Sequence, residues 1–217
     1  MKKFDTDMRD AFFNELYDIA AQDSRLVIVS SDMGARSLEK FSKDFSSQYF
    51  TVGIAEQNMV SISAGLALGG KIVFMYAIAP FATLRCYEQI KVDLCCMHLS
   101  VTSIGIGVGF SVPQDGPTHY TTEDIAIMRA LPGMTILNPS DGVMTKAFAR
   151  IAYEDPGPKY VRLDKEALPL IYHNRPDDFS DGLTILKAGR DLTIIATGIM
   201  VHKAFKVVDE LAKCSID

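Results

Sequence analysis

Glu56 is the first residue of this sequence whose type and neighbours could support chemistry. Its flanks are apolar or small, with Ile54 and Ala55 before it and Met59 and Val60 after it. A carboxyl group held in such surroundings is suited to general acid–base catalysis. Its position alone favours a plainer interpretation, an acid in the first turn of a helix, where the helix dipole stabilises negative charge.

His119 is the second candidate, because it follows Asp115 by four residues and comes after the glycine-rich segment 105–109. An imidazole and a carboxylate at the end of a strand suit proton transfer or anion binding. The Asp-Gly-Pro sequence that separates them is also ordinary turn chemistry, which by itself predicts only a surface loop.

Two further segments hold weaker candidates. Phe81 and Tyr87 follow an apolar strand and could form an aromatic wall, although most aromatic side chains simply belong to a core. Arg162 ends another apolar run, where a guanidinium could clamp a phosphate or carboxylate group. It could equally pair with a nearby acid.

Strands and helices alternate along the chain. Several apolar runs are continuous, which is typical of strands covered on both faces of a parallel sheet. We therefore predict an α/β fold with a doubly wound, mostly parallel sheet and helices on both faces, and ligands beyond the carboxyl ends of the strands. The predicted strands are Leu26–Ser30, Tyr49–Gly53, Lys71–Ile78, Ser100–Gly107, Met134–Asn138, Lys159–Leu163 and Asp191–Thr197, and the helices are Asp7–Ala21, Ala55–Leu68, Tyr87–Met97, Thr122–Ala130, Ser140–Glu154 and Val201–Lys213.

The organisation changes near residue 171, where a polar segment with a proline and clustered acids reads as a linker. The one strand and one helix predicted beyond it cannot bury both faces of a sheet. We expect a first domain at residues 1–170, a linker at 171–188, and the start of a truncated C-terminal α/β domain at 189–217.

Composition excludes several classes of protein. The 217 residues are 48% hydrophobic and 23% charged, with a net charge of −5, so we expect a folded chain without general affinity for nucleic acid or anionic lipid. No apolar run reaches the ~18–20 residues of a membrane span, and the N-terminus lacks a signal-peptide core, which gives a cytoplasmic location by default. The four cysteines have no CxxC spacing and are expected as buried free thiols. No dinucleotide-binding glycine motif or P-loop is present.

In their order and spacing, six motifs resemble the pyrimidine-binding half of transketolase-like thiamine diphosphate enzymes, and above all transketolase C-terminal subunits. The resemblance covers roughly residues 5–170. Its motifs are Ser31-Asp32-Met33-Gly34, Val52 to Met59, Ala64-Gly65-Leu66-Ala67, Pro80-Phe81 through Tyr87-Glu88-Gln89, Asp115-Gly116-Pro117-Thr118-His119 and Asn138-Pro139-Ser140-Asp141.

This resemblance implies a role for each candidate. Glu56 would share a proton with N1′ of the aminopyrimidine, which makes the 4′-imino tautomer accessible as a base. Phe81 would stack on the pyrimidine ring, and Tyr87 would line the same wall. His119 would be the second catalytic residue and contact a hydroxyl or phosphate group of the substrate. Substrate contacts are also implied for Asp32, for Asp115 toward a sugar hydroxyl, and for Arg162 toward a phosphate.

The implied activity is the transfer of a two-carbon ketol unit between sugar phosphates. The Gly-Asp-Gly motif with which this family holds Mg²⁺ and the diphosphate is missing, so no metal ligand is expected on this chain. An N-terminal transketolase subunit would supply that half, in an assembly with a homodimer of this chain or as a heterotetramer. The alternatives are a 1-deoxyxylulose-5-phosphate synthase-like subunit, a 2-oxoacid dehydrogenase E1 β-like subunit, and a non-catalytic partner module.

Overall fold

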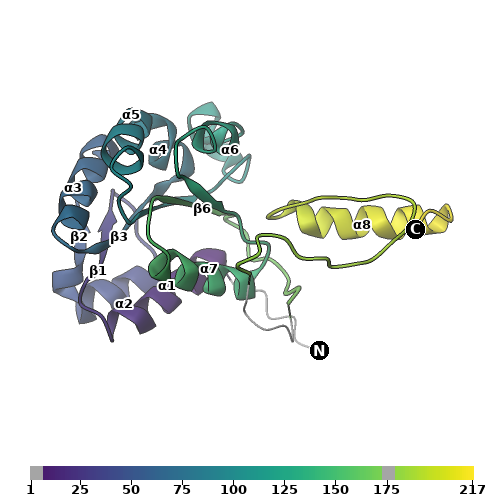
Figure 1. Ribbon diagram of the computed structural model, residues 1–217, viewed down its shortest axis with the longest axis horizontal. Helices are drawn as coiled ribbons and strands as arrows, with labels where there is room; N and C mark the ends of the chain where they lie inside the picture. Colours follow the sequence, from purple (N-terminus) through teal and green to yellow (C-terminus); the bar gives the residue numbers. More distant parts are fainter. Residues whose placement is uncertain (1–6, 173–178) are drawn as a thin grey trace.

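The structure, a computed structural model, describes residues 7–172 and 179–217. Six strands form one sheet in which every pairing is parallel, as predicted (Figure 1). Their spatial order is β2-β1-β3-β4-β6-β5. In chain order they are β1 (Leu26–Ser30), β2 (Tyr49–Thr51), β3 (Ile72–Ile78), β4 (Val101–Ile106), β5 (Thr135–Leu137) and β6 (Lys159–Leu163).

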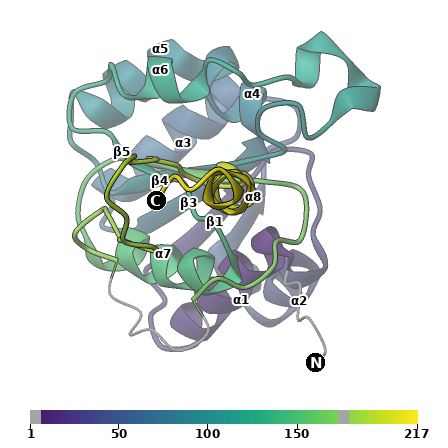
Figure 2. The same ribbon diagram turned by 90° about the vertical axis from the view of Figure 1, so that its right-hand side faces the viewer.

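Helices cover both faces of this sheet (Figure 2). One face carries α1 (Met8–Ala20), α2 (Arg36–Asp44) and α7 (Gly142–Glu154). The other face carries α3 (Glu56–Leu68), α4 (Ala79–Ala82), α5 (Tyr87–Gln89) and α6 (Asp124–Met128), and α5 continues into the π-helical turn η3 (Ile90–Cys95). The doubly wound arrangement predicted from the sequence is therefore confirmed.

The central strands bury their side chains on both faces. In β1 and β3, alternate residues enter two separate cores, with Ile28 and Phe74 on the α1 side and Val27 and Val73 on the α3 side. All four side chains are inaccessible to solvent or nearly so. A strand that is apolar at every position can only be stable between two helical layers, which explains why continuous apolar runs predicted this fold.

Two elements differ from the sequence-based prediction. Helix α2 was not predicted, because its short, highly charged segment offers only Leu38 and Phe41 as buried positions. The strand predicted at Asp191–Thr197 is wrong. In the described parts of the chain this segment pairs with no other strand, and an extended segment becomes a strand only when a neighbour completes its hydrogen bonds.

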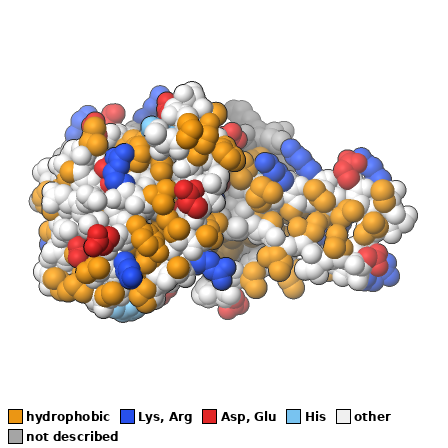
Figure 3. Space-filling view, turned by 90° about the horizontal axis from the view of Figure 1, so that it is seen from above, with side chains coloured by type: hydrophobic (Ala, Val, Ile, Leu, Met, Phe, Trp, Pro, Cys, Tyr) orange, Lys and Arg blue, Asp and Glu red, His pale blue; other side chains and the backbone are white. Residues whose placement is uncertain are grey.

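The C-terminal helix α8 (Met200–Lys213) confirms the last predicted helix and projects from the edge of the sheet (Figure 1). An extended stretch runs alongside it. Viewed from above, hydrophobic side chains are spread over this part of the surface (Figure 3). The most exposed large hydrophobic side chains of residues 179–217 are Leu183, Ile185 and Ile195. None of the described helices combines the length and apolar character needed to cross a lipid bilayer.

Asp141, near the carboxyl end of β5, connects two segments of the chain by hydrogen bonds. It caps a helix, because its Oδ1 accepts a hydrogen bond from the backbone N–H of Met144 in α7 at 2.8 Å. Its Oδ2 accepts from the backbone N–H groups of Ile171 and Tyr172 at 2.7 and 3.0 Å. A single fully buried carboxylate thus ties α7 to the chain that follows β6.

We expect Asp141→Ala to lower the free energy of unfolding by about 1–3 kcal/mol, because it leaves three backbone donors without their acceptor. Asp7→Ala is the matched control. Asp7 also caps a helix, but it is half-buried, and from the residues that the structure describes its side chain accepts one hydrogen bond, from Asp10 N at 3.1 Å. Urea denaturation of both variants measures the difference, and equal losses would contradict the fastening role of Asp141.

Candidate functional site

The candidate residues gather at the carboxyl-terminal edge of the sheet. Glu56 follows β2, Phe81 follows β3, and His119 lies in the loop after β4. All strands are parallel, so their carboxyl ends share one edge, which is where ligands bind in open α/β sheets.

Glu56 is the first residue of α3, and its side chain is only 3% exposed. The N-terminus of the helix stabilises a carboxylate there through its dipole and its free N–H groups. The carboxylate also accepts a hydrogen bond from Nη1 of Arg85 at 3.0 Å, to its Oε2 atom. A buried acid that pairs with an arginine and follows the end of a strand is therefore the centre of the candidate site.

Phe81 brings three of these groups together. The guanidinium carbon Cζ of Arg85 lies 3.6 Å from the centre of the Phe81 ring, in cation–π contact. The His119 ring packs edge-on against the same phenyl ring, with centroids 5.1 Å apart and planes at 69°. Glu56, Arg85, Phe81 and His119 are thus contiguous, and we call them the Glu56 cluster.

Short-range packing fixes the position of Phe81. Helix α4 begins directly at the end of β3, and the Thr83 hydroxyl donates to the Ala79 carbonyl at 2.7 Å. Gly105 of β4 lets this helix sit close to the sheet, because a Cβ atom at Gly105 would lie 3.0 Å from Ala79 Cα. Cys86 donates its thiol to the Phe81 carbonyl at 3.3 Å, and burial raises the pKa of this thiol to about 12.

The loop after β4 carries His119. The chain turns there at Gly107 and Gly109, whose φ angles of +77° and +62° suit glycine. The Nδ1 atom of His119 lies 3.0 Å from the Thr118 hydroxyl. Asp115 is exposed in the preceding 3₁₀ turn, and its contact with a sugar hydroxyl stays a prediction.

Arg162 lies at the end of β6 within a buried polar network. Its Nε donates to Oδ2 of Asp124 at 2.7 Å, and the Tyr160 hydroxyl donates to the same oxygen at 2.8 Å. Asp124 is 1% exposed, and burial together with this carboxylate raises the pKa of Tyr160 well above its usual value. The acid left open as a partner of Arg162 is therefore Asp124, and phosphate binding by Arg162 stays a prediction.

The structure places the two other predicted residues apart from these contacts. Tyr87 donates its hydroxyl to the Ile127 carbonyl of α6 at 2.8 Å and packs against the core on the α3 side. Asp32 is exposed in the turn after β1. Their cofactor and substrate roles stay predictions.

The prediction that the four cysteines are buried free thiols is half right, because Cys86 and Cys95 are buried whereas Cys96 and Cys214 are exposed.

Arg85 and Asp124 are the residues of the candidate site that sequence reasoning missed. A cation in the otherwise apolar stretch after β3 was visible in the sequence, but its partner Glu56 is 29 residues away. Likewise, Asp124 and Arg162 are 38 residues apart. Only the folded sheet brings each pair together.

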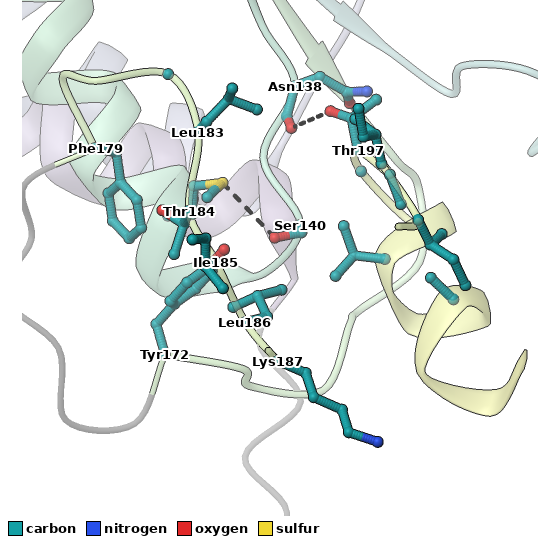
Figure 4. A pocket seen from close by; sticks show the side chains of 18 of the residues that line it. Asn138, Ser140, Tyr172, Phe179, Leu183, Thr184, Ile185, Leu186, Lys187 and Thr197 are labelled. Carbon is teal, nitrogen blue, oxygen red and sulfur yellow. Dashed lines mark hydrogen bonds between the residues drawn. The ribbon is translucent and has the colours of Figure 1, made fainter. Parts of the chain in front are cut away.

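A cavity of about 1530 Å³ lies elsewhere, between α7 and the C-terminal segment. Figure 4 shows its walls, in which the apolar side chains of Phe179, Leu183, Ile185 and Leu186 predominate. Thr197 donates its hydroxyl to the Asn138 carbonyl at its rim. No group of three or more His, Cys, Asp or Glu side chains that could hold a metal ion occurs in residues 7–172 and 179–217.

Comparison with known proteins shows the family to which this chain is similar. Residues 5–170 match the family model described as "Transketolase, pyrimidine binding domain". The chain is 40% identical over 202 residues to a subunit of the apulose-4-phosphate transketolase of Phocaeicola vulgatus, covering 91% of this chain and 64% of that protein. It is 37% identical over 208 residues to "6-deoxy-6-sulfo-D-fructose transketolase subunit SqwH" of a Clostridium species, covering 94% of this chain and 64% of that protein.

Among solved structures, "Split gene transketolase, inactive beta4 tetramer" superposes with a TM-score of 0.85 at 34% identity, covering 97% of this chain and 69% of that one. The chain thus spans about 64% of the length of the two curated relatives named above.

Proposed function

This chain belongs to the transketolase family, whose pyrimidine-binding domain it carries, and we propose that it supplies the aminopyrimidine-binding half of a thiamine diphosphate site. The observation that carries the proposal is the buried carboxylate of Glu56, which Arg85 links to the face of Phe81. A planar nitrogen heterocycle needs these two features, an apolar face to stack on and an acidic group at its edge.

When bound, thiamine diphosphate supplies a nucleophilic carbon and an electron sink for cleavage next to a carbonyl group. The residues of this chain would orient the pyrimidine ring of the cofactor and polarise it. Glu56 would hold a proton at N1′ of the pyrimidine, and the low solvent exposure of its side chain keeps water from competing for that proton. Phe81 would fix the ring plane, and Tyr87 would support the same wall from α5.

The substrate would lie on the His119 side of Phe81. We propose that His119 exchanges a proton with, or hydrogen-bonds, a substrate hydroxyl or phosphate, and that Asp115 and Asp32 contact the sugar or an adjoining subunit. Asp124 engages Nε of Arg162 and thereby orients that side chain. The terminal nitrogens of Arg162 are the atoms that we propose contact a substrate phosphate.

A second chain would complete the site. The sequence has no Gly-Asp-Gly motif, so we assign Mg²⁺ and the diphosphate group to an N-terminal subunit. Ile54, two residues before Glu56, is 75% exposed, and this exposed apolar side chain supports pairing with another chain near Glu56. The proposed assembly contains either a dimer of this chain or a heterotetramer. Within the chain we propose residues 1–170 as the pyrimidine-binding domain, 171–188 as a linker and 189–217 as part of a second domain.

Reconstitution tests this function. The chain is mixed with a candidate N-terminal subunit, thiamine diphosphate and Mg²⁺, and ketol transfer from a ketose phosphate to an aldose phosphate is followed. We expect transfer only when both subunits and the cofactor are present. If pyruvate replaced the ketose phosphate as the effective donor, the reaction would instead be of the deoxyxylulose-phosphate synthase or 2-oxoacid dehydrogenase kind.

A further inference from the structure

Arg85 makes two contacts that together define a binding position. The flat guanidinium group lies over the ring of Phe81, with Cζ 3.6 Å from the ring centre. At its edge, Nη1 donates to Oε2 of Glu56 at 3.0 Å. One planar cation therefore uses both the stacking surface and the buried carboxylate of the Glu56 cluster.

A 4-aminopyrimidine that carries a proton at N1′ has the same chemical character. It is flat, its positive charge is delocalised over an N–C–N system, and its ring N–H can donate to a carboxylate. On the proposed function, which this inference rests on, that ring would use the face of Phe81 and the carboxyl of Glu56. We propose that Arg85 is a placeholder for the aminopyrimidine ring, and that the cofactor displaces it on binding.

Burial explains why a placeholder is needed. The side chain of Glu56 is only 3% exposed, and a buried carboxylate without a partner is costly. Arg85 pairs with this carboxylate and keeps it in place while the ring of the cofactor is absent. The same pairing opposes catalysis, because a carboxylate engaged by a guanidinium is not free to share a proton with N1′.

Exposure explains why the placeholder can leave. The side chain of Arg85 is 40% exposed, so it can swing into solvent without crossing the core. Partly exposed ion pairs and cation–π contacts are each weak, so the two contacts hold the guanidinium without locking it. Arg85 is thus a positioning residue that acts through Glu56.

A binding experiment with 4-amino-2,5-dimethylpyrimidine tests this inference on the full chain, because the fragment needs no diphosphate site. The probe is titrated at a pH where its N1 nitrogen is protonated and can donate to Glu56 as Arg85 does, and its dissociation constant is measured by NMR for the native chain, Arg85→Met and Arg85→Ala. We expect both variants to bind the probe roughly 3- to 30-fold more tightly than the native chain. Raising the salt concentration should weaken binding to the Arg85 variants more than binding to the native chain, because in the native chain the probe only replaces one cation by another at Glu56.

Two further variants separate the possible outcomes. Arg25→Met is the matched control, because Arg25 also pairs with an acid, Asp23 at 2.6 Å, on another part of the surface, and we expect no change in binding. Glu56→Gln should weaken binding. If the Arg85 variants bound no more tightly while Glu56→Gln still weakened binding, the placeholder inference alone would be overturned. If no variant bound the probe in a saturable way, the pyrimidine-site proposal would fall with it.

Discussion

Glu56→Gln is expected to reduce kcat for ketol transfer by at least roughly 10²- to 10⁴-fold in the reconstituted two-subunit enzyme, the range typical of a lost acid–base group. The amide has almost the same shape as the carboxyl group, so the Phe81 face and the helix start are kept. It cannot give or take the proton that the proposed mechanism needs at N1′. The effect should fall on turnover even at saturating cofactor, which is how kcat and cofactor affinity are separated.

The fold should survive this substitution, because the ion pair that it removes involves an Arg85 side chain that is 40% exposed and therefore contributes little to stability. Glu39→Gln is the matched control. Glu39 is also an acid in the first turn of a helix, α2, but it is exposed on the other side of the sheet. Turnover above about a third of the native rate in Glu56→Gln would remove Glu56 from the mechanism.

The sequence was most informative where burial alone decides structure. Continuous apolar runs such as Val27–Val29 predicted strands covered on both faces, and the sheet is built that way. The site followed from this, because Glu56, Phe81 and His119 were each predicted just beyond a strand. Parallel strands bring such positions to one edge, although they lie as much as 63 residues apart.

What the sequence could not predict are pairings between distant polar groups. Arg85 was visible as a cation after β3, but nothing in its neighbourhood indicates that it stacks on Phe81 and pairs with Glu56. The segment 191–197 failed for a related reason. Its composition is strand-like, yet a strand is defined by a partner, and local sequence does not contain the partner.

The second large effect is expected at Asp124, where two donors depend on one buried carboxylate oxygen. Tyr160 is completely inaccessible to solvent, Asp124 is 1% exposed, and the side chain of Arg162 is 14% exposed. Removing the carboxylate leaves a buried hydroxyl and a largely buried guanidinium without their shared acceptor. Removing one partner of a buried ion pair typically lowers the free energy of unfolding by about 3–5 kcal/mol, since the charge of the other partner is left buried and uncompensated.

We therefore expect Asp124→Ala to lower the free energy of unfolding by about 3–5 kcal/mol, which for a chain of this size is a fall in Tm of roughly 6–20 °C. Asp23→Ala is a closely matched control, because Asp23 likewise accepts from an arginine, Arg25, and from a tyrosine, Tyr153. The Arg25 side chain is 62% exposed, so water replaces the lost partner there and the expected loss is about 1 kcal/mol or less. Similar losses in the two variants, measured by thermal and urea denaturation, would show that burial does not set the strength of the Asp124 network. A larger loss at Asp124 would mean that the fold itself holds Arg162 in place through this buried carboxylate.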